Sequence, residues 1–125
     1  MTALRGLLAE ARRLEVSVHR ARLDDDRLGY YDHERGQVIV GLDVTHRQFL
    51  CTLAHELAHA FYGHSCEEDP SDRQARKRAA WLLVDPGHYA AAEALNPDPG
   101  AIAAELDLTR KVVEDYRRFW LDPRA

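Results

Sequence analysis

The fold is decided by residues 52–64, which read Thr52-Leu53-Ala54-His55-Glu56-Leu57-Ala58-His59-Ala60-Phe61-Tyr62-Gly63-His64. Good helix formers surround two histidines four residues apart, and residues at that spacing lie one turn above each other on an α-helix. His55 and His59 therefore project from one face and can close on a single ion, with Glu56 beside it. Neutral imidazole is a good ligand for zinc. The spacing predicts a zinc-binding helix.

The residues around the two histidines are apolar, so we expect this helix to be buried. They are Leu50, Leu53, Ala54, Leu57, Ala58 and Phe61. A buried helix that carries His, Glu and His needs a partner for these polar groups, and a metal ion supplies one. Two histidines and one carboxylate leave a fourth position for water, whose proton Glu56 can take. The alternative, a chance pair of surface histidines, leaves the apolar surroundings unexplained.

The composition is that of one soluble domain. The chain has 125 residues, of which 46% are hydrophobic and 30% charged, and its net charge of −4 gives no electrostatic reason to expect nucleic-acid binding. No apolar run approaches the roughly 20 residues that span a bilayer. The first residues do not resemble a signal peptide. We therefore expect a cytoplasmic protein without membrane association, whose two cysteines are free.

Patterns along the chain predict an α+β fold. Residues 4–14 have helical periodicity, residues 16–18 alternate like a short strand, and residues 28–40 read as a hairpin that packs beside the metal helix. Asp43 or Thr45 can cap that helix, and Ser71 or Asp72 can start the next one. Three more helices are expected at 88–95, 101–106 and 109–120.

Zinc in a hydrolytic site usually has three protein ligands, so one more is needed. Asp72 is well placed, because it opens a helix whose Ala75 and Ala79 indicate close packing against the metal helix. From the first turn its carboxylate can point back at the ion. His64, Glu67 and Glu68 lie in the intervening stretch and are the alternatives.

Two motifs together carry a resemblance to a known family. Residues 53–64 and the segment Asp72-Arg73-Gln74-Ala75-Arg76-Lys77-Arg78-Ala79-Ala80-Trp81-Leu82-Leu83-Val84 resemble the ImmA/IrrE-type metallopeptidases, small zincins common in bacteria and phages. The likeness covers roughly residues 28–95. It implies that Asp72 ligates zinc with His55 and His59, in place of the family's Glu, and that His64 supports the site. Arg76 replaces the family's Asn/Asp and cannot accept a hydrogen bond from an imidazole.

The resemblance implies a zinc-dependent metallo-endopeptidase that cleaves a cytoplasmic regulatory protein, such as a phage or mobile-element repressor. Glu56 would be its general base and zinc its cofactor. An additional oxyanion donor is expected, with Tyr30, Tyr31 and His88 as candidates. The alternative is a catalytically weak or inactive module that binds a repressor or another partner protein, with zinc structural. The departures at Asp72 and Arg76 favour this alternative, whereas the intact Glu56 argues against it.

The C-terminal helices resemble a helix-turn-helix core, but the acidic total favours a structural role over direct nucleic-acid binding. Their apolar residues suffice for a core: Ile102, Leu106, Leu108, Val112, Val113, Tyr116, Phe119 and Trp120. We expect residues 1–125 to form a single zincin-like metallopeptidase domain with a helical cap at 101–125. Its fold would be a minimal zincin: a small sheet, a metal-binding helix and a helical C-terminal half.

Overall fold

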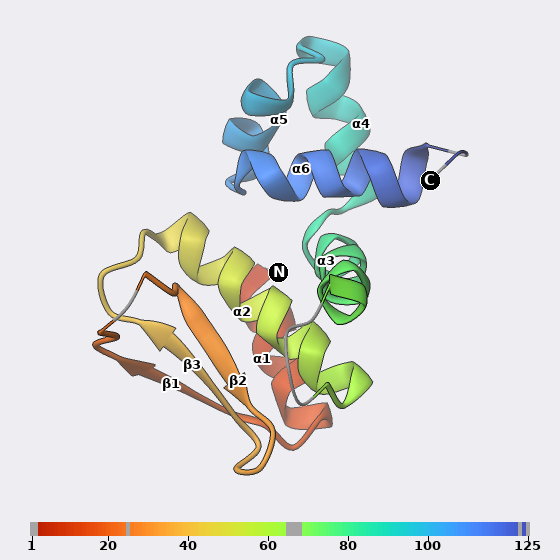
Figure 1. Ribbon diagram of the computed structural model, residues 1–125. Coiled ribbons are helices and arrows are strands. Elements are labelled where there is room, and N and C mark those ends of the chain that lie inside the picture. Colours follow the sequence, from red (N-terminus) through yellow and green to blue (C-terminus); the bar gives the residue numbers. More distant parts are fainter. Residues whose placement is uncertain (1–2, 25, 65–68, 123, 125) are drawn as a thin grey trace.

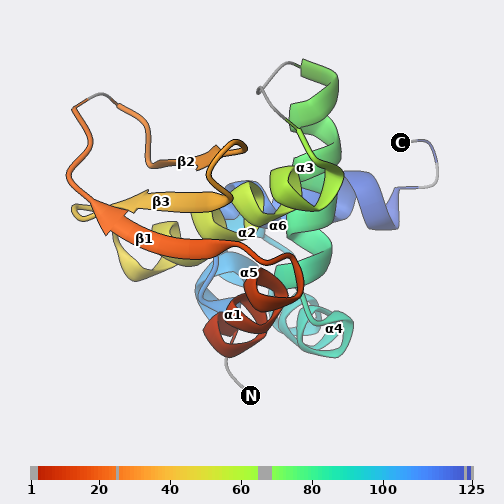
Figure 2. The same cartoon turned by 90° about the horizontal axis from the view of Figure 1, so that it is seen from below.

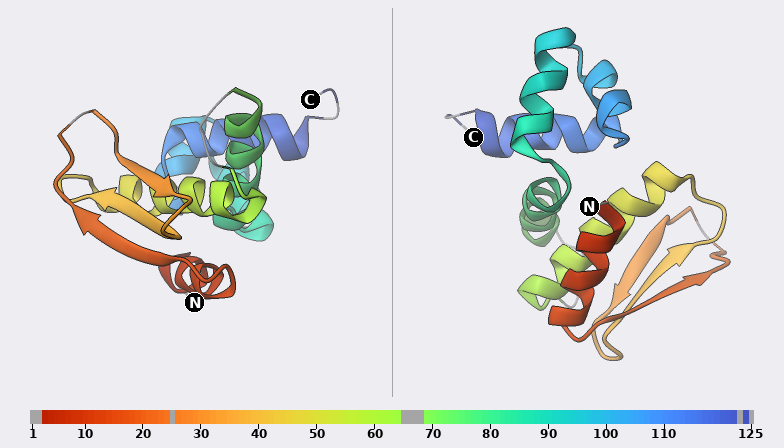
Figure 3. Two further views of the ribbon diagram at one scale, coloured as in Figure 1. Left: turned by 60° about the horizontal axis from the view of Figure 1, so that its bottom comes forward. Right: turned by 180° about the vertical axis from the view of Figure 1, so that it is seen from behind.

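The computed structural model describes residues 3–24, 26–64, 69–122 and 124, and it has the expected α+β architecture (Figure 1). A small sheet lies at one end of the molecule, the C-terminal helices lie at the other, and α3 lies between them (Figures 1 and 3). Among the described residues, no helix combines the length and the apolar character that crossing a membrane requires.

The sheet has the strand order β1-β3-β2, where β1 is Ser17–Ala21, β2 is Gly29–Asp32 and β3 is Gln37–Gly41. β3 pairs with β1 in parallel and with β2 in antiparallel register, so the predicted hairpin is confirmed. The apolar run of β3 is buried because this strand is central. The strand expected at 16–18 begins one residue later and extends to Ala21.

Helix α2, His46–Tyr62, carries the histidine pair. It begins at a capping box, in which the Thr45 side chain accepts from the Gln48 backbone and the Gln48 side chain accepts from the Thr45 backbone. It ends at Tyr62 and is capped by Gly63, whose φ of 70° favours glycine. The hairpin packs closely on this helix: a Cβ added at Gly29 would lie 2.7 Å from Thr52 Cγ2. β2 thus lies directly against the metal helix, as predicted.

Helix α1, Ala3–Arg13, lies beside α2 (Figures 2 and 3). Helix α3, Asp69–Leu83, also packs on α2. It begins before the expected Ser71 or Asp72, because Pro70 is tolerated in a first turn, where its missing N–H would have no intrahelical partner. Its inner face is made of small buried residues, among them Ala75 and Ala79 at 0% and 4% exposure. Small side chains bring the two helices close together.

The C-terminal half contains α4 (Pro86–Leu95), α5 (Pro99–Leu106), α6 (Arg110–Tyr116) and the π-helix η1 (Arg117–Leu121). Asp85, Asp98 and Thr109 cap the three α-helices through side-chain bonds to backbone N–H groups. Helix α6 packs on α3 and on α5, with Ile102 and Val113 fully buried.

Three aromatic residues expected in the core are more exposed than predicted. Phe61 is 46% exposed and Trp120 41%, while Phe119 is half-buried. Their neighbours explain the difference. The Arg78 guanidinium lies 3.4 Å from the centre of the Phe61 ring, and the Trp120 indole donates to the Lys77 carbonyl at 2.8 Å. The Phe61 and Trp120 rings thus contact a cationic and a polar neighbour instead of filling the core.

Candidate metal centre

His55 and His59 come together on one face of α2, as their spacing requires. Their Nε2 atoms lie 3.2 Å apart, and the ring centroids are 4.8 Å apart with the planes nearly perpendicular. His59 is buried at 1% exposure, whereas the His55 side chain is 23% exposed. The pair is therefore shielded from solvent at His59 and accessible to solvent at His55.

Asp72 reaches this pair from the first turn of α3. Its Oδ1 lies 3.1 Å from His55 Nε2, and the three donor atoms of His55, His59 and Asp72 all lie within 4.8 Å of one another. The Asp72 side chain is 36% exposed, so the open side of the group is shared by Asp72 and His55. A short carboxylate suffices here because the alanine-rich face of α3 lets the helix approach α2 closely.

The donor set fits a zinc ion. Two imidazole nitrogens and one carboxylate oxygen are ligands that zinc uses in hydrolytic sites, where a fourth position stays open. Ligand atoms on a tetrahedral ion at about 2.0–2.1 Å are roughly 3.3 Å apart. The two closest separations in the group, 3.2 Å and 3.1 Å, are near that value.

His64 contacts the opposite ring nitrogen of His59. The two Nδ1 atoms lie 2.9 Å apart, and His64 Nε2 lies 2.9 Å from Gln74 Oε1. If His59 Nε2 is to keep a lone pair for a metal, its Nδ1 carries the proton and donates to His64. His64 then carries its own proton on Nε2 and donates to Gln74. Such contacts orient a ligating histidine and fix its tautomer.

Glu56 follows His55 and lies about 100° further round α2. The residue is buried at 4% exposure. It is the one carboxylate on α2, next in sequence to His55, and most of the other buried residues of the helix are apolar. A carboxylate with so little access to water is suited to moving a proton rather than to solubilising the surface.

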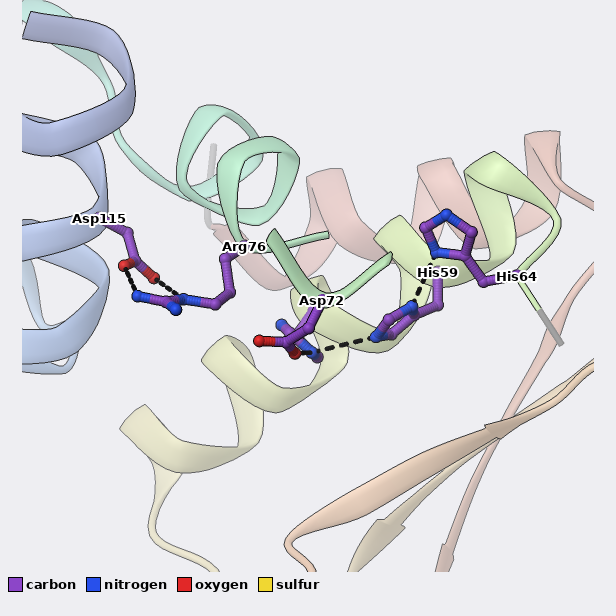
Figure 4. A network of polar contacts seen from close by, with 6 residues as sticks. His59, His64, Asp72, Arg76 and Asp115 are labelled. Carbon is purple, nitrogen blue, oxygen red and sulfur yellow. Dashed lines mark hydrogen bonds and ion pairs between the residues drawn. The ribbon is translucent and has the colours of Figure 1, made fainter. Parts of the chain in front are cut away.

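Arg76, one turn after Asp72, links α3 to α6. Its Nε donates to Asp115 Oδ2 at 3.2 Å and its terminal nitrogen donates to Asp115 Oδ1 at 2.5 Å. Figure 4 shows Asp115, Arg76, Asp72, His59 and His64 in a row across the site. The pKa of Arg76 is raised, first by its hydrogen bond to Asp115 and also by the charges of Asp115 and Asp72, against an opposing effect of burial.

A family model for the IrrE N-terminal-like domain, a peptidase domain, matches residues 9–119. The chain belongs to this family. The match extends the likeness seen in the two motifs to the second half of α1 and to the C-terminal helices as far as residue 119. No curated protein matches the sequence significantly.

The alternatives to Asp72 as the third ligand either lie away from the three donor atoms or fall outside the described residues. Glu67 and Glu68 fall within the undescribed segment 65–68. His64 faces the rear nitrogen of His59 and not the three clustered donor atoms. Cys51, one turn before His55, contacts the Thr109 hydroxyl at 3.5 Å, and burial raises the pKa of its thiol.

The three oxyanion candidates have contacts of their own. Tyr31 lies with its hydroxyl 3.4 Å from His33 Nδ1, and the Arg27 guanidinium stacks over the Tyr30 ring. His88 lies on α4, 80% exposed, next to Asp85.

Two residues of the site were missed from the sequence. No sequence pattern marks Gln74 or Asp115 as a site residue. Gln74 is an exposed glutamine within a helix, and Asp115 is one of several charged residues in its helix. Only the packing of α3 against α2 and α6 brings Gln74 to His64 and Asp115 to Arg76.

Proposed function

We propose that this chain is a zinc-dependent metallo-endopeptidase. The observation that carries the proposal is the convergence of His55, His59 and Asp72, with Glu56 next to His55, in a member of a peptidase family. Two imidazoles, one carboxylate and a separate base are the parts that hydrolysis of an amide at a metal requires.

When bound, zinc would lower the pKa of a water molecule toward neutrality and polarise the scissile carbonyl. The chain's own residues do the rest. His55 and His59 present unprotonated Nε2 atoms, and His64 keeps the proton of His59 on Nδ1. Glu56 accepts the proton of the attacking water on its carboxylate and delivers it to the leaving amine nitrogen, so that it ends the cycle unprotonated.

The position of β2 at the edge of the sheet favours a protein as the substrate. β2 is an outer strand in the order β1-β3-β2 and lies against α2. An extended peptide can add to such an edge through main-chain hydrogen bonds. Within this proposal the substrate is a cytoplasmic regulatory protein such as a phage or mobile-element repressor, which the likeness to ImmA/IrrE-type peptidases suggests.

The test separates catalysis from metal binding. Zinc-loaded protein is incubated with a peptide library derived from a bacterial proteome, and cleavage is read by mass spectrometry. Glu56→Gln should keep zinc and the melting temperature but lose all cleavage, because an amide cannot accept the proton. Glu105→Gln, at an exposed position on α5, is the matched control and should cleave normally.

Two results would overturn the proposal. Cleavage that persists in Glu56→Gln would exclude Glu56 as the base. A wild-type protein that holds one zinc per chain but cleaves no peptide in the library would favour the non-catalytic binding module instead.

A further inference from the structure

The Arg76–Asp115 pair connects the metal-ligand helix α3 to the C-terminal helix α6. It is a fork-shaped contact: two nitrogens of one guanidinium bind the two oxygens of one carboxylate. Such bidentate pairs restrict the orientation of both side chains. Asp115 is buried at 5% exposure, so the anchoring end of the pair is held within the packed helices.

The guanidinium held in this way is one helical turn from Asp72. Residues at i and i+4 are neighbours on a helix surface, and an acidic residue followed by a basic one is the favourable order. Arg76 makes its hydrogen bonds to Asp115 and none of its described contacts is to Asp72, so the guanidinium faces Asp72 as a neighbouring cation held in place by Asp115. The Asp72 carboxylate thus has His55 Nε2 at 3.1 Å on one side and a fixed cation toward the other, as the row of side chains in Figure 4 shows.

Asp72 needs such a constraint. Its side chain is 36% exposed, and an exposed aspartate on the first turn of a helix can otherwise adopt several rotamers. Because Asp115 balances the charge of Arg76, the cation can attract the Asp72 carboxylate while the pair as a whole adds no net charge beside the donor atoms.

We propose that Arg76, anchored by buried Asp115, is a positioning residue that fixes the orientation of the Asp72 carboxylate between the guanidinium and the His55–His59 pair, so that the C-terminal helices support the metal centre. The inference rests on the metal group and is independent of whether the protein cleaves peptides.

Two simpler explanations make different predictions. If the pair only docks α6 on α3, any replacement that keeps the helices packed leaves metal affinity unchanged. If Arg76 acts only as a nearby positive charge, its removal strengthens the binding of a cation. Positioning alone predicts that metal affinity falls in a protein that remains folded.

The decisive variant is Arg76→Met combined with Asp115→Leu. An apolar pair of similar volume can replace a buried ion pair without loss of stability, so the melting temperature should stay near that of the wild type. We expect zinc affinity, measured by competition with a chromophoric chelator at fixed pH, to fall roughly tenfold. The measurement needs no substrate, so its outcome is separate from that of the cleavage test.

A matched control exists in the Arg47–Asp107 pair, which joins the start of α2 to the end of α5 with Nε and Oδ1 2.9 Å apart. Arg47→Met with Asp107→Asn removes another inter-helix Arg–Asp pair, and Asn suits the left-handed backbone at this position. Its zinc affinity should equal that of the wild type.

A single substitution covers the case in which the double variant does not fold. Arg76→Lys keeps the charge but not the two parallel hydrogen bonds, so the protein should fold and bind zinc several-fold more weakly. Wild-type zinc affinity in a folded Arg76→Met/Asp115→Leu protein, or in Arg76→Lys, overturns the inference. Tighter binding in either variant does the same.

Discussion

The Nδ1 atoms of His59 and His64 lie 2.9 Å apart, and His64 in turn lies 2.9 Å from the Gln74 side-chain oxygen. This sequence of contacts has one consistent assignment of protons when His59 Nε2 serves as a ligand. His59 donates to His64, and His64 donates to Gln74. If His59 binds a metal through Nε2, His64 would therefore influence the site indirectly, by fixing the tautomer of His59.

His64→Ala should weaken zinc binding about 10- to 100-fold, the usual effect of losing a residue that orients a ligating histidine. His64→Gln restores an acceptor near His59 Nδ1 and should recover part of the affinity. Chelator competition measures the effect, and His88→Ala, on an 80% exposed side chain, is the control. Unchanged affinity in His64→Ala would show that the tautomer of His59 is fixed by another contact.

Asp72→Ala should weaken zinc binding more than His64→Ala does, because it removes one of the three expected ligands. Asp72→Glu should bind zinc nearly as the wild type does, since the longer side chain still offers a carboxylate from the same turn of α3. Elemental analysis after dialysis against a weak chelator measures the retained zinc. If Asp72→Ala keeps its zinc while Glu67→Ala or Glu68→Ala loses it, the third ligand comes from the segment before α3.

Acid should destabilise the protein through Glu10. Burial of this carboxyl disfavours its charge, but hydrogen bonds from Arg78 and Arg13 outweigh burial and hold its pKa below 4.5. Because the pKa of Glu10 is lower in the folded than in the unfolded protein, its ionised carboxylate stabilises the fold at pH values above the unfolded-state pKa of about 4.5. This stabilisation is lost as the pH falls through the lower pKa of the folded state. Urea unfolding between pH 3 and pH 7 measures the effect. As the pH is lowered, the free energy of unfolding should fall less in Glu10→Gln than in the wild type. Glu34→Gln, at an exposed turn position, should follow the wild-type curve.

Ile102→Ala should cost about 2–5 kcal/mol in the free energy of unfolding, because Ile102 is fully buried among the C-terminal helices. Leu95→Ala, at 81% exposure, should change it by less than about 0.5 kcal/mol. Trp120→Ala should fall between them, since the ring is 41% exposed. Chemical denaturation gives all three values. An Ile102→Ala protein as stable as the wild type would show that these helices are not packed as described.

The sequence by itself determined the elements whose signals are local. The spacing of His55 and His59 puts both rings on one helical face wherever that helix lies, and hairpin chemistry around residues 28–40 gives an antiparallel pair. Capping chemistry likewise limited the start of α2 to Asp43 or Thr45, and the structure has Thr45. These are relations between near neighbours, for which backbone geometry alone supplies the distance.

Only the tertiary structure decided which groups from other elements complete the site. Asp72 meets His55 because small alanines let α3 approach α2, and Gln74 meets His64 for the same reason. Asp115 lies 39 residues beyond Arg76 in the chain, and only the packing of α6 on α3 joins them. Contacts of this kind depend on how whole helices pack, and packing reflects the summed shape of many side chains rather than any short motif.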